Sequence, residues 1–296
     1  MKYKIDLHMH STASDGTQSP AKVVALAKER GLNLIALTDH DTIEGLEEAL
    51  IVAKNYNIHF VAGIELNVIY RTNLYKNGEK TLTLDLLGYF IDYKNNNYFD
   101  KEFITTLEES RKYRIWRAKE VLNKTNSDLI IEGKQIITDQ EWNNLVKNTQ
   151  GSFSRVHIAE LMIKKGLVEN HNKAFQKYLI KNDVPKKELT LETGSALIRR
   201  NKGLVVLAHP HGKDQYTLRN FLPNIEDHGP ILKSMLPYID GLECYYWDHK
   251  KPQTDYYIKF ARNSNLIITG GSDHHGGEKN RLGRQFVPEY VREFFS

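Results

Sequence analysis

Histidines and carboxylates follow several apolar segments of this chain, where side chains of these types could bind cations. After five such segments the sequence places His8 and His10, Asp39 to Asp41, Glu65, His209, and Asp273 to His275. A mixed set of imidazole and carboxylate ligands suits zinc, manganese or iron better than calcium. The chain has one cysteine, Cys244, so a structural zinc site built on thiolates is disfavoured.

Each of these motifs has an ordinary alternative when taken alone. In an extended chain His8 and His10 point to the same side, as two ligands of one cation would, yet pairs of this spacing are often incidental. Asp41 could cap a helix, and the residues around His209 and Asp273 could form polar turns. The joint pattern is more specific, because the carboxyl ends of parallel barrel strands meet on one face. We therefore expect these residues to converge in one cation site.

A site of this kind favours the hydrolysis of phosphate esters. Two cations roughly 3.5–4 Å apart can hold both the attacking and the leaving oxygen, and a cation converts bound water to hydroxide near neutral pH. The chain contains neither a Gly-rich phosphate loop nor a GxSxG motif, so nucleophilic serine chemistry is not supported. A metal-activated hydroxide is the expected nucleophile.

The ligands require strands to position them, and the sequence predicts strands on both sides of a helical segment. Strands are predicted at residues 3–7, 32–37, 60–64, 81–90, 204–207, 241–245 and 266–269. Ser19 and Pro20 should start a helix that Gly31 ends, and the capping-box spacing from Asp41 to Glu44 should start another. A further helix is expected near residues 253–264. Alternating strands and helices predict parallel βαβ units and an α/β fold.

Residues 99–202 carry helical periodicity and few strand signals. Phe103, Leu107, Ile115 and Leu122 could form one apolar stripe of a helix. Further helices are predicted near residues 155–165, 171–182 and 190–200. We therefore expect a discontinuous barrel of residues 1–98 and 203–296, with a helical insertion at residues 99–202.

The basic charge of the chain lies in this insertion. The formal net charge is only +4, but residues 101–202 contain 20 Lys and Arg against 13 Asp and Glu. This excess could belong to a solvated helical surface, or it could form a positive lid over an anionic substrate. Charge alone leaves both interpretations open.

The composition is that of a soluble globular protein. The chain has 296 residues, of which 40% are hydrophobic and 26% charged. Its first residues lack the apolar core of a secretory signal, and no apolar run approaches the ~20 residues that span a bilayer. A single cysteine fits a reducing compartment. We expect a cytoplasmic protein without membrane association.

Taken together, the motifs resemble the PHP (polymerase and histidinol phosphatase) superfamily, and the resemblance covers nearly the whole chain. Its residues are His8-Met9-His10-Ser11, Asp15-Gly16, Thr38-Asp39-His40-Asp41-Thr42, Gly63-Ile64-Glu65, Ala208-His209-Pro210 and Gly271-Ser272-Asp273-His274-His275-Gly276. Arg155-Val156-His157-Ile158-Ala159 and Ala174-Phe175-Gln176-Lys177-Tyr178-Leu179 resemble one branch of that superfamily. That branch contains nucleoside-3',5'-bisphosphate phosphatases and 5'–3' exoribonucleases active on short RNA.

The resemblance implies a distorted (β/α)7 TIM-like barrel with a helical insertion that caps the metal site. It also implies two or three divalent cations, of manganese, zinc or iron. The implied ligands are His8, His10, Glu65 and Asp273 for a first metal, Glu65 and His209 for a second, and Asp15, His40 and His275 for a third. Asp85 stands where the family usually has a histidine ligand of the second metal. Asp85 could ligate that metal, or the site could be weak.

Arg155 and His157 are the substrate-binding residues that the resemblance implies, through contacts to the substrate phosphate. Their alternative is a pair at the surface of a helix N-terminus. His40 and Asp273 are the predicted catalytic residues, with His40 assisting the leaving group. Residues 245–247 could stack a base or could pack as a loop anchor, and Glu243 is expected to lie behind the ligands.

The expected function is metal-dependent phosphoesterase activity on nucleotides, as a nucleoside 3',5'-bisphosphate phosphatase or a 5'–3' exonuclease on short oligonucleotides. One alternative is a phosphatase of a small metabolite such as histidinol phosphate. Another is a non-catalytic metal-binding PHP module. The expected partners are a phosphorylated small molecule or nucleotide, or short RNA or DNA, and no protein partner is inferred. A sequence-specific nucleic-acid-binding protein is not supported, since the chain has no recognised motif for it.

Overall fold

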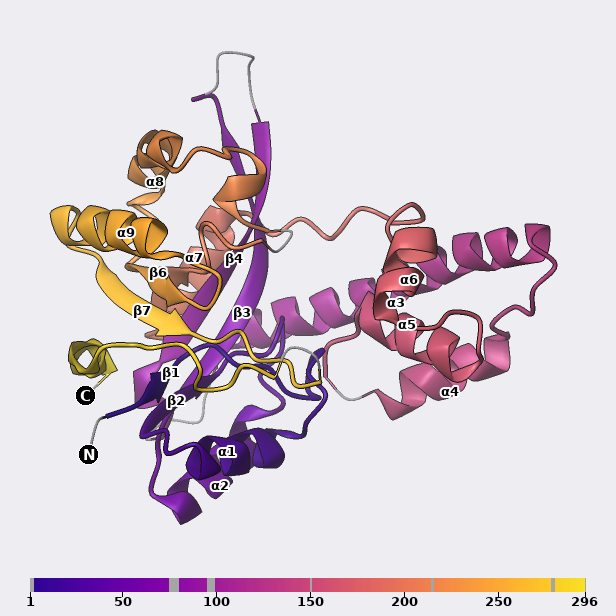
Figure 1. The fold of residues 1–296 in the computed structure, drawn as a ribbon, viewed down its shortest axis with the longest axis horizontal. Coiled ribbons are helices and arrows are strands. Elements are labelled where there is room, and N and C mark those ends of the chain that lie inside the picture. The colour runs from indigo at the N-terminus through magenta and orange to yellow at the C-terminus, as the bar shows by residue number, and fades with distance from the viewer. Residues whose placement is uncertain are drawn as a thin grey trace. The chain divides into compact units, whose positions relative to one another are not determined.

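The computed structural model describes residues 3–74, 80–94, 99–149, 151–213, 216–277 and 280–295. The chain forms two compact units (Figure 1). One unit combines Met1–Ile104 with Glu188–Ser296, and the other is Thr105–Lys187. Across the described ranges, no helix combines the length and the apolar character that crossing a bilayer requires.

The first unit is built on a sheet of seven strands that pair in the order of the chain. The strands are β1 (Ile5–Asp6), β2 (Leu34–Leu37), β3 (His59–Thr72), β4 (Lys80–Phe90), β5 (Leu204–Leu207), β6 (Gly241–Tyr246) and β7 (Ile267–Gly271). The backbone N–H of Leu7 donates to the carbonyl of Gly270 at 3.1 Å, and Met9 forms a parallel bridge with His274. Because these contacts join the first strand to the last, the sheet is nearly closed into the expected barrel.

Strand β4 runs antiparallel to both of its neighbours, β3 and β5, whereas we expected parallel units throughout. The physical reason is the connection, since too few residues lie between Thr72 and Lys80 for the crossover that a parallel pair needs. Strand β3 is also longer than residues 60–64, the predicted range. It continues through Glu65 to Thr72, so Glu65 lies within the strand rather than at its end.

Helices pack against the strands of this unit, and the first of them has the predicted boundaries. Helix α1 (Pro20–Glu29) has Ser19 as its N-cap, whose side chain accepts a hydrogen bond from the Lys22 N–H, and Gly31 follows it with a φ of 72°. The helix expected to start near Asp41 begins later, as α2 (Leu46–Tyr56), because Asp41 has a φ of 50° and cannot continue a helix.

The remaining helices of the barrel unit follow the later strands. They are α7 (Leu191–Arg200), α8 (His228–Met235) and α9 (Lys251–Asn263), with short 3-10 turns η1 (Ile91–Lys94), η3 (Leu218–Asn220), η4 (Ile225–Asp227) and η5 (Glu289–Phe295). Helix α9 matches the predicted segment 253–264, and α7 packs against β3, β4 and β5. The predicted insertion 99–202 included α7, which belongs to the barrel unit by its contacts.

Burial of the strands on both faces forms the core of the barrel. All residues of β2, Leu34 to Leu37, are buried, as expected of a strand covered on both sides. Inside the barrel the Tyr89 hydroxyl donates to the Leu7 carbonyl at 2.9 Å, which satisfies one polar group of that interior. Gly271 on β7 leaves room for His8, because an added Cβ would lie 2.3 Å from the His8 Cβ.

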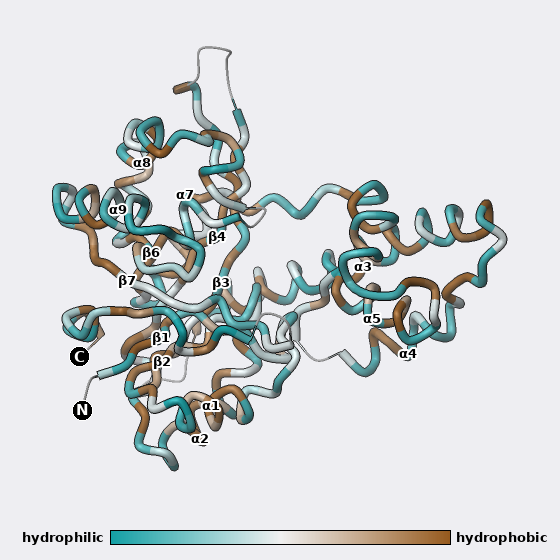
Figure 2. The backbone as a smooth tube through the Cα atoms, viewed as in Figure 1, coloured by the Kyte–Doolittle hydropathy of each residue, from teal (hydrophilic) through white to brown (hydrophobic). Residues whose placement is uncertain are grey.

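The second unit is helical and has a hydrophobic core of its own. Its elements are the main part of α3 (Lys101–Ile131), α4 (Asp139–Asn148), α5 (Arg155–Lys164), α6 (His171–Ala174) and the π-helical turn η2 (Phe175–Leu179). Leu122 of α3 is fully buried there with Trp142, Met162 and Tyr178. Hydrophobic residues recur between hydrophilic ones along α3 (Figure 2), which agrees with the predicted apolar stripe.

Candidate metal centre

Nine predicted ligands come from seven places in the barrel unit, and their side chains lie together. His8 and His10 follow β1, Asp15 lies in the next loop, His40 follows β2, Glu65 and Asp85 lie within β3 and β4, His209 follows β5, and Asp273 and His275 follow β7. Ligand atoms within 4.8 Å of one another form three overlapping groups: His10, Asp15, His40 and His275; His8, His10 and Glu65; and His40, Glu65 and Asp85. The predicted convergence of distant residues is therefore present.

Glu65 lies at the centre of this cluster. Its Oε2 atom is 3.2 Å from the Nε2 of His8, 3.1 Å from the Nε2 of His10 and 3.2 Å from the Nδ1 of His40. Its Oε1 atom is 3.2 Å from the Nε2 of His209. The two oxygens of one buried carboxylate thus face different sets of imidazoles, as a carboxylate that bridges two cations does.

Asp273 is the second carboxylate that faces several rings. Its Oδ1 is 3.6 Å from the Nε2 of His8, 3.4 Å from the Nε2 of His10 and 3.4 Å from the Nδ1 of His275. Its Oδ2 accepts a hydrogen bond from the Tyr246 hydroxyl at 2.9 Å. The backbone of Asp273 has a φ of 50°, a left-handed conformation that directs this side chain from the end of β7 into the cluster.

Asp15 faces both histidines of the third predicted group of ligands. Its Oδ1 is 3.3 Å from the Nε2 of His275, and its Oδ2 is 4.0 Å from the Nε2 of His40. The rings of His10 and His275 stack with centroids 4.1 Å apart, which links this group to the first. His40 has the most exposed side chain of the nine, at 22%, so it lies on the solvent side of the cluster.

Asp85 borders the cluster on the β4 side. Its Oδ2 is 3.9 Å from the Nε2 of His209, and its Oδ1 accepts a hydrogen bond from the Asn67 side chain at 2.7 Å. Asn67 and Asp85 are directly paired across β3 and β4, which places both side chains on one face of the sheet. Asp85 is therefore positioned beside Glu65 and His209, where a second cation would be held.

Glu243 of β6 orients two of the histidines without joining the ligand groups. The Nδ1 of His8 is 3.0 Å from the Glu243 Oε1, and the His209 backbone N–H donates to the Oε2 at 2.8 Å. Since His8 donates its Nδ1 proton to this carboxylate, its Nε2 is left as the nitrogen that faces Glu65. This position behind the ligands agrees with the one we expected for Glu243.

Two further buried carboxylates hold the loops that carry ligands. Asp39 accepts hydrogen bonds from the Ser11 N–H at 2.7 Å, the Ser11 hydroxyl at 2.7 Å and the Ser14 hydroxyl at 2.6 Å, which fixes the loop between His10 and Asp15. Asp6 accepts from the backbone N–H of Ser272 at 2.9 Å. Burial raises the pKa of both carboxyls. Asp39 thus supports the site and is not placed among its ligands.

The charge of the cluster fits divalent cations. Burial would lower the pKa of His10, but its contacts with Asp273 and Glu65 outweigh burial and raise the pKa to about 10. For His209, the same competition with Glu65 raises the pKa to about 9. The buried carboxylates therefore stabilise positive charge beside them, on protonated rings or on bound cations. Ligands ~2.1 Å from one tetrahedral cation lie roughly 3.4 Å apart, close to the separations found around Glu65.

The two predicted substrate-binding residues have partners within the helical unit. Arg155 forms an ion pair with Asp183, with 2.7 Å between Nη1 and Oδ2, and lies over the Phe175 ring. His157 completes a capping box at the start of α5, since its Nδ1 accepts from the Ser154 N–H at 3.1 Å. These contacts stabilise the first turn of α5. A contact of either residue with substrate stays a prediction.

Sequence reasoning did not identify Tyr246 and Asn67, which support the ligands Asp273 and Asp85. Tyr246 had been considered only for base stacking or packing, and its ring packs 5.2 Å from that of His209. A signal existed for Tyr246, since it lies in the same strand as Glu243. No sequence pattern pointed to Asn67, because its pairing with Asp85 depends on the register of β3 with β4.

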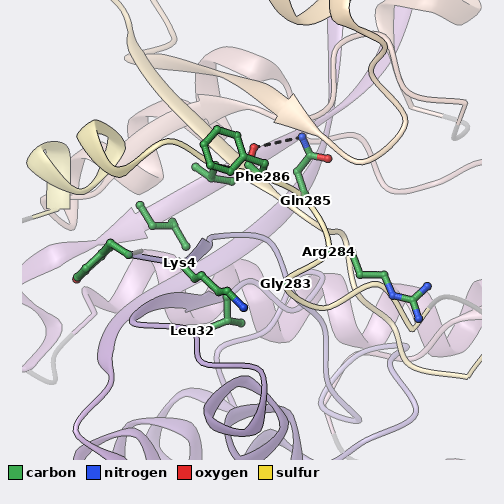
Figure 3. A pocket seen from close by; sticks show the side chains of 9 residues that line it. Lys4, Leu32, Gly283, Arg284, Gln285 and Phe286 are labelled. Atoms are coloured by element: carbon green, nitrogen blue, oxygen red, sulfur yellow. Dashed lines mark hydrogen bonds between the residues drawn. The ribbon is translucent and has the colours of Figure 1, made fainter. Parts of the chain in front are cut away.

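A surface pocket lies elsewhere on the barrel unit and includes none of the predicted ligands (Figure 3). Its lining comes from the start of β1 and the residues before it, from the segment before β2, and from the chain after β7: Tyr3, Lys4, Ile5, Leu32 and residues 283–287. Its lining has no cluster of titratable groups. The pocket therefore adds no chemistry to the centre around Glu65.

Comparison with known proteins places these features in a family. The PHP domain family matches residues 6–184 of the chain. A 5'-3' exoribonuclease of Haemophilus influenzae is 29% identical over 286 residues, which cover 93% of this chain and 91% of that protein. A 3',5'-nucleoside bisphosphate phosphatase of Chromobacterium violaceum is 28% identical over 283 residues, covering 94% of this chain and 89% of that protein.

The fold of this chain is also similar to that of a protein of known structure. A solved structure of a protein from Bifidobacterium adolescentis superposes with a TM-score of 0.77 at 23% identity, covering 99% of this chain and 95% of that one. The family match spans most of the chain, and the barrel carries the imidazoles and carboxylates that the resemblance implied. The chain belongs to the PHP domain family.

Proposed function

We propose that this chain hydrolyses phosphate esters of nucleotides or short oligonucleotides at the centre around Glu65. The chain is an enzyme, a metal-dependent phosphoric ester hydrolase of the PHP family. The observation that carries the proposal is the Glu65 carboxylate, whose two oxygens face His8, His10 and His40 on one side and His209 on the other. Such an arrangement suits a pair of bridged cations.

Divalent cations at this centre would supply Lewis acidity toward phosphate oxygens and lower the pKa of a nearby water. The residues that would hold them are the nine described above. Glu65 and Asp273 supply negative charge on fixed atoms, and Tyr246 holds Asp273 in place through its 2.9 Å hydrogen bond. Glu243 fixes the orientation of His8, so that its Nε2 stays directed at Glu65. Pre-set positions of this kind avoid reorganisation during the reaction.

We assign His40 to the substrate side of the centre. Its side chain is the most exposed of the set, at 22%, and its Nε2 points toward Asp15 at 4.0 Å. A ring in this position would hold a cation close to the leaving oxygen of a bound ester. Asp273 is assigned to the opposite, buried side, where its oxygen faces His8 and His10.

A nucleotide substrate is supported by the relatives and by charge. The two relatives described above are named for activity on RNA and on a nucleoside bisphosphate. Residues 101–202 carry more basic than acidic side chains, 20 against 13. Positive charge raises the local concentration of polyanionic substrates. Manganese, zinc and iron all suit the ligand set, so the proposal names no single metal.

A substrate panel tests the proposal. Metal-depleted protein is reconstituted with manganese or zinc and given a nucleoside 3',5'-bisphosphate, 5'-phosphorylated short RNA, histidinol phosphate and p-nitrophenyl phosphate. We expect cation-dependent release of phosphate or nucleotide, with nucleotide substrates preferred. Preference for histidinol phosphate would refute the nucleotide assignment, and no turnover of any ester would identify a non-catalytic metal-binding module.

A further inference from the structure

Arg281 lies flat against Trp247 in the barrel unit, and neither residue belongs to the metal centre. The Cζ atom of Arg281 is 3.4 Å from the centre of the Trp247 ring. Stacking of a guanidinium on an aromatic face fixes the plane and direction of the cation. Because an arginine side chain is otherwise long and mobile, this contact pre-orders its N–H groups.

The guanidinium of Arg281 has no carboxylate partner among the described residues. Its buried Nη1 has no hydrogen-bond partner there, and the same holds for the buried Nε1 of the stacked Trp247. Two N–H donors without acceptors are costly, at about 1–3 kcal/mol each. By contrast, Arg117 and Arg155 both form ion pairs with Asp183. Arg281 is thus a positioned cation that the described chain does not neutralise.

The chain neighbours of Arg281 and Trp247 contact residues at the metal centre. The Trp247 ring lies 5.8 Å from the ring of Tyr246, whose hydroxyl donates to Asp273. The Tyr246 ring in turn lies 5.2 Å from that of His209. On the other side, Leu282 follows Arg281 and donates its backbone N–H to the Nδ1 of His274 at 3.3 Å. The pair is therefore separated from residues of the centre by one neighbouring residue on each side, Tyr246 and Leu282.

We propose that Arg281, held by Trp247, binds a second phosphate of the substrate, distinct from the phosphate that is hydrolysed. This inference rests on the proposed function. The cations and their ligands account for the scissile phosphate, whereas Arg281 offers an unpaired fork of N–H donors, the geometry that recognises a phosphate through two oxygens. The pair would select substrates with two phosphate groups over simple monoesters.

Two classes of substrate present such a second phosphate. One is a nucleoside 3',5'-bisphosphate, whose second group is a terminal monoester. The other is a 5'-phosphorylated oligonucleotide, whose next group is a backbone diester with a single charge. Arg281 would favour both over p-nitrophenyl phosphate. A larger preference for the bisphosphate would identify the terminal phosphate as the group that Arg281 binds.

The test compares Arg281→Ala, Arg281→Lys and Trp247→Phe with the unmodified protein, all loaded with manganese. Loss of a charged hydrogen bond predicts a KM for the bisphosphate that is roughly 10- to 100-fold higher in Arg281→Ala. The kcat and the KM for p-nitrophenyl phosphate should stay within about twofold. Arg281→Lys should restore part of the lost affinity, because it keeps the charge and loses the fork, and Trp247→Phe should keep most of it.

Arg284→Ala is the matched control, since Arg284 lies three residues further along and is exposed beside the pocket of Figure 3. It should leave every KM unchanged. Equal changes of KM for one- and two-phosphate substrates in Arg281→Ala, or no change at all, would overturn the inference. If Arg281→Ala does not fold, Arg281→Lys decides, and an unchanged bisphosphate KM there counts against the site. Failure of the proposed function gives a different result from failure of this inference, because the unmodified protein would then release no phosphate or nucleotide from any substrate.

Discussion

At the scale of single residues, the centre depends on one carboxylate that faces imidazoles from three parts of the chain. Glu65 contacts His8 and His10 through one oxygen and His209 through the other. All of these side chains are almost fully buried, so their charges are balanced by one another, by neighbouring buried carboxylates such as Glu243, and by cations. Changes at the ligands should therefore affect metal binding far more than folding.

His10→Ala and Asp273→Ala should each abolish activity. Each change removes a predicted ligand that faces several other residues of the centre, so we expect kcat/KM to fall by at least about 100-fold together with loss of bound metal. The checks are elemental analysis of the purified variants and circular dichroism for the fold. His171→Ala, an exposed histidine outside the centre, is the control. Retained activity in either variant would remove that residue from the ligands.

Asp85→Asn should weaken a single cation site. The variant keeps the hydrogen-bonding oxygen that Asn67 reaches but removes the charge beside His209. We expect the affinity of one cation to fall roughly 10- to 100-fold, with the others unaffected. Titration of the metal-free protein with manganese, followed by equilibrium dialysis, measures this stoichiometry. If metal content and rate are unchanged, Asp85 is not a ligand.

Metal uptake should release protons, and its affinity should rise with pH. In the metal-free protein the pKa values of His10 and His209 are raised to about 10 and about 9, so both rings are protonated at pH 7.5. Cations bind the neutral ring, so each of these ligands must give up its proton. Burial opposes protonation of His8 as well, but contacts with Glu243 and Glu65 raise the pKa of His8 well above its usual range. Calorimetric titration in two buffers of different ionisation enthalpy should therefore show at least two protons released. Uptake without proton release would contradict this assignment.

At the scale of elements, the hairpin of β3 and β4 explains how a reversed strand still contributes a ligand. Directly paired residues of antiparallel strands lie on the same face, so Asp85 faces the same side as its partner Asn67. Glu65 lies two residues before Asn67 and therefore shares that face. A parallel β-bridge pairs His40 with Glu65, so Glu65 in β3 lies beside the residues that follow β2. Close packing of β1 and β7 then completes the ring of ligands.

Gly271→Ala tests that packing at the junction of the first and last strands. The new Cβ would lie 2.3 Å from the His8 Cβ and 2.6 Å from the His8 backbone nitrogen, so β1 must move. We expect a loss of stability of roughly 1–3 kcal/mol and weaker metal binding, since His8 moves with β1. Denaturant unfolding and metal titration measure the two effects. Gly229→Ala in α8 is the control, because its Cβ meets only the Tyr256 hydroxyl, at 3.3 Å.

At the scale of the whole molecule, the protein has two units with separate hydrophobic cores. The barrel unit contains every predicted metal ligand, and the helical unit contains Arg155 and His157. The core of the helical unit includes buried residues of α3, α4 and α5, among them Leu122. Its stability should therefore respond to changes that leave the metal centre intact.

Leu122→Ala and metal removal should affect different unfolding transitions. Loss of the buried leucine should destabilise the helical unit by about 2–5 kcal/mol while metal content stays the same. Chelation should lower the midpoint of the barrel unit, which binds the cations only when folded. Differential scanning calorimetry with and without chelator separates the two effects. A single transition that shifts equally in both experiments would show that the units unfold together.

The sequence by itself determined the residue types of the centre, the boundaries of helices such as α1, and the helical character of the middle segment. These features depend on local signals: caps, apolar periodicity and motifs that resemble a known family. The PHP family and the barrel fold were predicted from the motifs that resemble that family. The later start of α2 was not predicted, because the left-handed backbone of Asp41 is set by the loop around the site.

Only the tertiary structure decided how the ligands meet. His209 and Glu65 are 144 positions apart in the chain, and their contact depends on the register of β3, β4 and β5. The antiparallel register of β3 with β4 also pairs Asn67 with Asp85, and the pairing of β6 with β7 brings Tyr246 close to Asp273. Likewise, no pattern in the sequence indicated that Arg281 and Trp247 lie in contact. Contacts of this kind arise from closing the sheet on itself, a property of the whole barrel that no local pattern encodes.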